Sequence, residues 1–455
     1  MQVALPTPTS QMQSLHNDIR VNQELQTMNE YTGTQAGLNS QYPITVIRWL
    51  FYAFIFSLIF ETAGEEMGLI EPPTLIGGML VLSTLLQPGL FLRWPPKGFW
   101  CFIIYLYLFV MMGLMEPAAY RSLFVHDVTV LFQLTILAWI AYNVMRDSTT
   151  AERALLTLAI ACSFLAVLQL GGVAHSAIDA KGSVQRAAAF GFHPNHLARI
   201  LILGMLALVG VLYSRRQNLT RPLLIFGPFL IVLAAVLIQT GSRGAILALG
   251  LALLTFALRK GSLGKKAVNI FGLLFLLGLL ALAAFQSDVM RTRFEETIED
   301  GDMARRELIY PTAWAMFKEK PLLGWGPVTS VYELGNRLGH PEEEIKNPHN
   351  LILYGVVTSG LLGSFPLFLG IGLAAFAAWK ARHSSHGMLP LAMVIAVLVV
   401  NMSGVWLFNK LHWIVMAYAL AAAYYPQALA TRSVVPVSEP EQAFSLGFMN
   451  ERKAS

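Results

Sequence analysis

The stretch EEEIKNPHNLILYGVVTSG, residues 342–360, changes within a few positions from charged and amide side chains to an apolar run. The run continues to about residue 378, long enough for a helix to cross the roughly 30 Å hydrocarbon core of a bilayer. The whole chain of 455 residues has this character, with 55% hydrophobic and 13% charged residues. Soluble domains carry about 25% charged residues, so the composition predicts an integral membrane protein.

About twelve apolar segments can be identified along the chain. They lie near residues 44–62, 74–92, 99–115, 123–144, 154–173, 196–214, 222–239, 244–258, 268–285, 350–378, 388–408 and 411–425. We therefore expect an all-α integral membrane protein with about 12 transmembrane helices.

Basic residues recur in alternate loops, whereas the remaining loops are poor in them. Because cytoplasmic loops are enriched in Lys and Arg, both termini should be cytoplasmic and the loop 286–349 should face outward. We expect a disordered cytoplasmic tail at 1–43, transmembrane helices 1–9 at 44–285, a large outer loop with an amphipathic helix at 286–349, transmembrane helices 10–12 at 350–425, and a cytoplasmic tail at 426–455.

The sequence disfavours several classes of ligand. The net charge of +5 arises from short loops, which membrane topology explains better than a nucleic-acid partner does. Cys101 and Cys162 lie inside apolar runs, so no disulfide framework and no zinc site are expected. Glu61, Glu65 and Glu66 of the first outer loop are interpreted as interface charges, and we expect neither a metal nor a cofactor.

Basic residues are rare on the outer face, and Arg243 is the clearest exception. Residues 240–244 form the whole link between two apolar segments. Gly241 and Gly244 permit a tight turn. Ser242 is suited to cap the following helix, whose N-terminus favours an anion. The alternative is an interfacial arginine whose stem is buried and whose charged head reaches water.

Arg186 begins a second group on the outer face. Three alanines follow it, and Pro194 with Asn195 suits a turn before the next helix. An ordinary loop arginine is the alternative interpretation, and His193 and His196 are weaker candidates for a functional role.

His349 has the local chemistry of a general base, because its ordinary pKa of about 6.5 permits proton exchange near neutral pH. Asn347 and Asn350 are placed to fix its ring by hydrogen bonds, and Pro348 stiffens the approach to the membrane. The alternative is a histidine that only caps a helix.

The outer loop contains RRELIYPTAWAMFKEKPLLGWG, residues 305–326, with apolar side chains at roughly helical spacing. This pattern predicts an amphipathic helix that lies on the outer leaflet or covers a cavity, and a helix that merely packs on its neighbours is the alternative. Arg305 and Arg306 at its start are candidates for contacts with phosphate groups.

These residues suggest one pocket. Arg186 and Arg243 would recognise a diphosphate through paired donors, and His349 would take a proton from an attacking hydroxyl. Such a set fits group transfer from a lipid diphosphate, with the arginines stabilising the leaving pyrophosphate.

Four motifs in one order carry a family resemblance: QRAAAFGFHPNHLA, QTGSRGAILAL, ARRELIYPTAWAMFKEKPLLGWGP and NPHNLILYGVVTSGLLG. Over roughly residues 150–425 the chain resembles the O-antigen ligase and O-antigen polymerase superfamily. The resemblance implies a metal-independent, inverting glycosyltransferase of the GT-C type in the bacterial inner membrane, with its site facing the periplasm. It also implies a glycan donor on undecaprenyl diphosphate, a lipid A–core acceptor, pyrophosphate binding by Arg186 and Arg243, and His349 as the base.

Two alternatives remain. A polymerase would use the same chemistry with a second carrier-linked glycan as its acceptor, and the sequence does not distinguish it from a ligase. A transporter for the lipid-linked glycan would need charged residues at mid-membrane depth and paired broken helices. The span interiors hold few candidates, such as Asp127 beside His126, so an enzyme is favoured.

Overall fold

The computed structural model describes residues 42–61, 71–173, 175–180, 184–214, 220–257, 263–299, 305–339 and 347–425. The two expected tails, apart from residues 42 and 43, lie outside the described residues, and so do Glu65 and Glu66.

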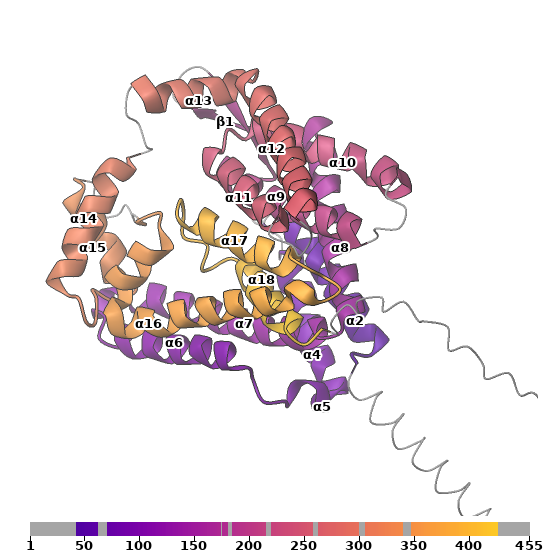
Figure 1. The fold of residues 1–455 in the computed structure, drawn as a ribbon. Coiled ribbons are helices and arrows are strands. Elements are labelled where there is room, and N and C mark those ends of the chain that lie inside the picture. Colours follow the sequence, from indigo (N-terminus) through magenta and orange to yellow (C-terminus); the bar gives the residue numbers. More distant parts are fainter. Residues whose placement is uncertain are drawn as a thin grey trace, which may run out of the picture.

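Helices make up most of the described chain (Figure 1). Their bounds are α2 (Thr45–Ser57), α4 (Pro72–Ser83), α5 (Pro88–Phe91), α6 (Lys97–Gly113), α7 (Arg121–Met145), α8 (Ser148–Leu170), α9 (Pro194–Ser214), α10 (Thr220–Gln239), α11 (Arg243–Ala257), α12 (Leu263–Phe285), α13 (Asp288–Glu299), α14 (Arg306–Glu319), α15 (Thr329–Arg337), α16 (Leu351–Lys380), α17 (Leu389–Asn401) and α18 (Lys410–Ala422). Four short 3₁₀ turns lie at Leu58–Phe60, Thr84–Leu86, Ala118–Tyr120 and Ala381–His383. Each of the twelve apolar segments contains a helix, so the expected helical class is confirmed.

The helices differ in length. Within the described residues, four stretches are long and apolar enough to cross a membrane: Ala118–Met145, Ser148–Leu170, Pro194–Leu212 and Leu351–His383. Further apolar helices are shorter, with 10–17 residues, and 15 residues in a helix span only about 22 Å. The chain is thus a membrane protein, and twelve crossings remain a prediction.

Small residues bring the helices into close contact. A Cβ atom on Gly98 of α6 would lie 2.9 Å from Leu420 of α18, and one on Gly204 of α9 would lie 2.5 Å from Cys162 of α8. Such van der Waals packing holds helices together in lipid, where the hydrophobic effect between them is weak. Cys101 and Cys162 are both free and buried, which confirms their prediction as core residues.

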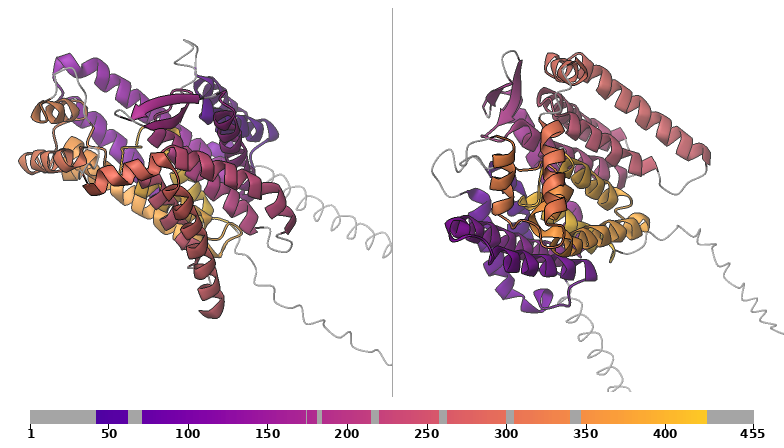
Figure 2. Two further views of the ribbon diagram at one scale, coloured as in Figure 1. Left: turned by 90° about the horizontal axis from the view of Figure 1, so that it is seen from above. Right: turned by 90° about the vertical axis from the view of Figure 1, so that its left-hand side faces the viewer.

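An antiparallel hairpin interrupts the helical pattern between α8 and α9, and the sequence did not predict it. Strand β1 (His175–Ala180) pairs with β2 (Val184–Ala189), with Ile178 opposite Arg186. Figure 2 shows the hairpin at an edge of the helical bundle. The expected loop position of Arg186 is therefore wrong, because the residue lies on a paired strand with a restricted backbone; its functional role stays a prediction.

The longest helix, α16, is broken at Gly360, whose φ of 60° and ψ of −168° are not helical. The break removes the helical partners of the carbonyls of Val357 and Thr358. The Trp325 N–H donates instead to the Val357 carbonyl at 2.8 Å, and the Gly326 N–H donates to the Thr358 carbonyl at 2.9 Å. The loop after α14 thus satisfies both carbonyls.

The same loop also satisfies the N–H groups beyond the break. Leu361 donates to the Pro321 carbonyl at 2.8 Å, and Leu362 donates to the Leu322 carbonyl at 3.1 Å. The approach is so close that a Cβ atom on Gly324 would lie 2.6 Å from the amide nitrogen at the break. Gly324 of LLGWG is therefore required by backbone contact as well as by its positive φ of 74°.

Both α14 and the first segment of α16, residues 351–359, end at this loop. Ile309, Ala313 and Met316 of α14 share one apolar cluster with Val356 and Val357 of that segment. The two helices therefore run side by side in the same direction, and both begin at the end that lies away from the loop. The predicted helix is confirmed as α14, and this cluster supports the packing interpretation of its apolar face.

Candidate functional site

Arg186 is held at the turn between α10 and α11. Its side chain is buried, its Nε donates to the Thr240 carbonyl at 2.8 Å, and its Nη2 donates to Asn195 Oδ1 at 2.9 Å. Asn195 lies in the first turn of α9, so the hairpin, α9 and the α10–α11 turn together position this guanidinium. The position of the Arg186 guanidinium is thus fixed by a strand, a helix and a turn that lie apart in sequence.

Arg243 is the first residue of α11 and follows directly from that turn. Gly241 has a φ of 64°, which an L-residue rarely adopts. A Cβ atom at Gly241 would lie 3.4 Å from Arg186 Nε, so the arginine side chain lies against this glycine. The Nη1 of Arg243 donates to the carbonyl of Arg293 on α13. The turn therefore brings Arg186, Arg243 and α13 together, as the sequence predicted for the first two.

A small pocket opens between these elements. Its lining residues are Asn195, Gly241, Ser242, Arg243, Gly244, Arg293, Arg306 and Ser403. Three of them are arginines, and none of the described residues that line it is acidic. The pocket has a cavity volume of about 60 Å³, far below the roughly 300–1,000 Å³ typical of small-molecule sites. It suits a phosphate group, and a glycan or polyprenyl chain would have to lie outside it.

Arg306 reaches this pocket from the start of α14. Its Nη2 donates to the Ser403 carbonyl at 2.9 Å, and the Tyr310 hydroxyl donates to the Met402 carbonyl at 2.8 Å. These bonds attach the first turns of α14 to the connection between α17 and α18. The neighbouring Arg305, also a candidate, has a left-handed backbone with φ 62° at the N-cap of α14 and does not line the pocket.

His193 and Asn195 support the arginines. The His193 Nδ1 accepts from the Asn195 N–H at 3.2 Å. Desolvation by the surrounding protein, followed by the nearby charges of Arg186 and Arg199, lowers the pKa of His193 below its ordinary value. A neutral imidazole that accepts this bond helps to orient Asn195, which in turn holds Arg186.

His349 immediately precedes α16 and has an unusual backbone. Its φ is 51°, and its N–H donates to Asn347 Oδ1 at 2.8 Å. Asn350 Oδ1 accepts from the N–H groups of Ile352 and Leu353 at 2.9 and 3.2 Å, so it caps α16. The bonds found for both amides go to backbone groups, and the ring is exposed to solvent. Left-handed backbone at a non-glycine residue is a strained conformation that recurs at functional sites.

His349 does not line the arginine pocket. It nevertheless precedes α16 at the same end at which Arg306 begins α14, because α14 and the first segment of α16 both run toward the loop 320–326. The structure thus brings Arg186, Arg243, Ser242, Asn195 and Arg306 to one place, with His349 at the corresponding end of the neighbouring helix.

A comparison with protein families gives one result: residues 228–368 match the O-antigen ligase family, Wzy_C. The chain thus contains a segment, residues 228–368, that is similar to the O-antigen ligase domain. This confirms the resemblance to the O-antigen ligase and polymerase superfamily. The domain includes Arg243, Arg306 and His349, whereas Arg186 lies before it. No curated protein matches the chain.

Two residues of the pocket were missed by sequence reasoning. Arg293, on α13, is a basic residue on a face that should be poor in them, so the charge rule could have identified it. Ser403 carries no such signal, because only the packing of the α17–α18 connection brings its carbonyl to Arg306. Among the described residues, no group of three or more His, Cys, Asp or Glu side chains is arranged to hold a metal ion.

The sequence interpreted Glu61 of the first outer loop as an interface charge, and in the structure this residue forms an ion pair. Glu61 pairs with Lys410 at the start of α18, and Glu71 lies 3.7 Å from the same amine. These two glutamates therefore serve to join distant segments, in agreement with a structural role for the described acidic residues of this loop.

Proposed function

We propose that the protein is a glycosyltransferase that moves a glycan from undecaprenyl diphosphate to a hydroxyl of a periplasmic acceptor, lipid A–core in the ligase case. The O-antigen ligase domain supports the reaction class. The observation that carries the donor assignment is the pocket formed by Arg243, Arg293 and Arg306 beside Arg186, without an acidic lining residue in the described chain. Converging guanidinium groups of this kind suit a diphosphate.

In the proposed reaction, His349 takes the proton of the acceptor hydroxyl while the hydroxyl oxygen attacks C1 of the donor sugar. The bond between C1 and the diphosphate oxygen breaks, and undecaprenyl diphosphate leaves with the electron pair. Attack from the opposite side inverts the configuration at C1. Arg186 and Arg243 stabilise the negative charge that develops on the leaving group, a task that many other glycosyltransferases give to a divalent cation.

The proposal also sets the orientation. The outer ends of α9, α11, α14 and α16 would face the periplasm, the termini would lie in the cytoplasm, and the protein would belong to the bacterial inner membrane. The alternation of basic loops supports this placement. A GT-C-type fold with about twelve crossings belongs to the same proposal.

The test is a transfer assay with purified protein, undecaprenyl-diphosphate glycan and lipid A–core, in the presence of EDTA. Wild-type protein should transfer glycan, and His349→Ala, Arg186→Ala and Arg243→Ala should each lose most of that activity. Arg382→Ala, at the opposite end of α16, is the control and should stay active. Elongated glycan without attachment to the core would identify a polymerase. If wild-type protein forms neither product, the enzyme proposal fails and a transporter becomes the better interpretation.

A further inference from the structure

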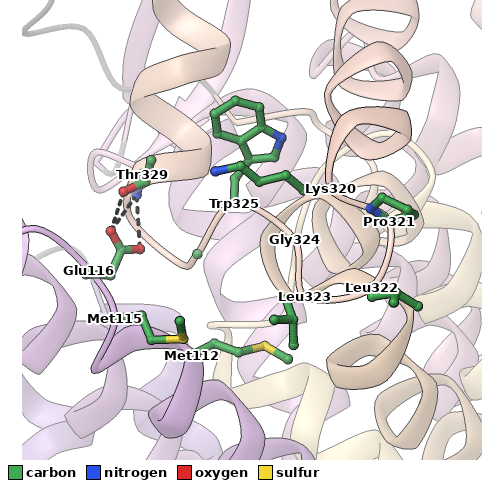
Figure 3. Close-up of a pocket in the computed structure, with 11 residues that line it drawn as sticks. Met112, Met115, Glu116, Lys320, Pro321, Leu322, Leu323, Gly324, Trp325 and Thr329 are labelled. Carbon is green, nitrogen blue, oxygen red and sulfur yellow. Dashed lines mark hydrogen bonds between the residues drawn. The ribbon is translucent and has the colours of Figure 1, made fainter.

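A second cavity lies at the other end of α14, and the reaction described above does not use it. It has a volume of about 470 Å³, within the range of about 300–1,000 Å³ typical of small-molecule sites. Its principal lining residues are Met112, Met115, Lys320, Leu322, Leu323 and Trp325 (Figure 3).

The rim of this cavity is apolar and exposed. Met115, Leu322 and Leu323 have 77%, 59% and 51% of their surface exposed. Met115 lies just beyond α6, at the end opposite the basic residues Arg93 and Lys97, so the proposed topology puts it at the outer boundary of the membrane. Contiguous exposed apolar side chains at that level mark a surface that contacts lipid.

One positive charge stands over this apolar surface. The Lys320 Nζ lies 3.8 Å from the centroid of the Trp325 ring, a cation–π contact. Arg337 also approaches that ring, at 5.0 Å, but it is paired with Glu319 at 2.6 Å and Glu333 at 2.7 Å. Within the described part of the chain, Lys320 forms no ion pair. Its charge is therefore available to an anionic group at the membrane surface.

The acidic residue in the wall does not cancel that charge. Glu116 is 8% exposed, and its carboxylate accepts from the Val328 N–H at 2.8 Å, from the Thr329 N–H at 3.1 Å and from the Thr329 hydroxyl. Figure 3 shows the bonds between Thr329 and this carboxylate. Glu116 therefore caps α15, whose N-terminus stabilises a negative charge.

The length of α14 sets the distance between the two sites. Arg306 at its start lines the arginine pocket, and Lys320 directly follows its end. The helix has 14 residues, or about 21 Å at 1.5 Å per residue. A molecule held at the cavity could reach the donor only through a headgroup of several sugar units.

We infer that this cavity binds the phosphorylated lipid end of a glycolipid acceptor, with a phosphate on Lys320 and acyl chains against Met112, Met115, Leu322 and Leu323. The inference rests on the proposed function, because only that function makes the bound glycolipid an acceptor. The lipid end stays at the membrane boundary while the glycan headgroup extends along α14 toward the donor. A phosphorylated glycolipid matches all three features: the apolar rim, the single unpaired cation and the separation from the arginine pocket.

The experiment compares Lys320→Glu with Lys318→Glu, an exposed lysine two positions earlier on α14 that does not line the cavity. Native mass spectrometry would measure retention of added lipid A, with phosphatidylglycerol as the comparison lipid. Transfer assays would measure KM for intact lipid A–core and for the delipidated core oligosaccharide. Binding of undecaprenyl diphosphate would be measured separately as a readout of the donor pocket.

Lys320→Glu should reduce lipid A retention and raise KM for lipid A–core about tenfold, as expected for the loss of one charged hydrogen bond. Binding of the donor carrier and transfer to the delipidated core should stay unchanged, and Lys318→Glu should resemble wild type. The inference is overturned if the two variants behave alike, if phosphatidylglycerol is retained as well as lipid A, or if transfer to the delipidated core falls equally. If wild-type protein transfers nothing, the proposed function fails, and lipid A retention still decides the cavity.

Discussion

The two ends of α14 meet very different surroundings. At its start, Arg306 joins Arg243 and Arg293 in a small pocket that is rich in positive charge. At its end, Lys320 borders a cavity several times larger, whose wall is mostly apolar. The same short helix therefore connects a site suited to a compact anion with a site suited to an amphiphile.

In the proposed reaction, this difference would separate the two lipid substrates. Concentrated charge without acidic neighbours selects for phosphate groups, because each guanidinium can donate two bonds. A cation beside an apolar rim favours an anionic amphiphile, because burial of the acyl chains adds to the attraction between the charges. Substitutions at the start of α14 should therefore change the use of the donor, whereas substitutions at its end should change KM for the lipid acceptor.

The largest effect is expected at the charged end. Arg243→Lys keeps the charge but loses the planar fork of donors and the bond to the Arg293 carbonyl. We expect kcat for transfer to fall about a hundredfold or more, as when one donor to a developing negative charge is removed. The loss should be equal for lipid A–core and for delipidated core. A loss confined to lipid A–core would mean that the two ends of α14 do not serve separate substrates.

The contact between the loop after α14 and the break in α16 should be sensitive to substitution of Gly360. In Gly360→Ala, the new Cβ would lie 2.2 Å from the Leu322 carbonyl and would also strain the positive φ. A destabilisation of about 3 kcal/mol is expected from these two effects, measured as a lower Tm in detergent. Gly372→Ala on the same helix is the matched control, because no atom lies within 4 Å of the added Cβ. An unchanged Tm for Gly360→Ala would mean that the loop is not held at the break.

The sequence was informative where a pattern is local. Apolar runs placed each of the twelve expected helices, because a helix in lipid must satisfy its own backbone bonds. The glycines of the 240–244 link also indicated a tight turn locally, and the structure has that turn between α10 and α11. The fold around Arg243 therefore followed from the sequence.

The parts that were missed depend on contacts between distant segments. The hairpin that carries Arg186 is short and alanine-rich, so it has little strand signal. The break in α16 at Gly360 is stabilised by a loop more than thirty residues away in sequence, and no local pattern near Gly360 reports it. Arg293 and Ser403 likewise reach the pocket only through tertiary packing.

A pH effect on stability should arise away from both ends of α14. Burial lowers the pKa of His386, in the loop between α16 and α17, to about 4, against about 6.5 in the unfolded chain. The folded protein keeps this ring neutral while the unfolded chain binds a proton, so stability is lost as the pH falls below about 6.5. The expected loss at pH 5 is about 2 kcal/mol.

The measurement is Tm at pH 7.5 and pH 5 for wild type, His386→Gln and His126→Gln. His386→Gln should show a smaller pH dependence, although the loss of the 2.8 Å bond to the Tyr418 hydroxyl lowers its Tm at pH 7.5. His126 has an exposed side chain, so its variant should follow wild type. Equal pH dependence in all three proteins would remove His386 as the cause.

The smallest expected effect distinguishes two arginines of α13. Arg293 lines the arginine pocket, whereas Arg291, two positions earlier, is exposed and paired with Glu295 at 2.8 Å. Arg293→Gln should weaken binding of undecaprenyl diphosphate about tenfold, the loss typical of one charged hydrogen bond. Arg291→Gln should bind it like wild type, because an exposed ion pair contributes little. KM for the lipid acceptor should be unaffected by either change, since α13 does not line the cavity at the end of α14. Equal weakening by both variants would mean that the pocket attracts the donor by its general positive charge, and the side chain of Arg293 would then have no specific place in it.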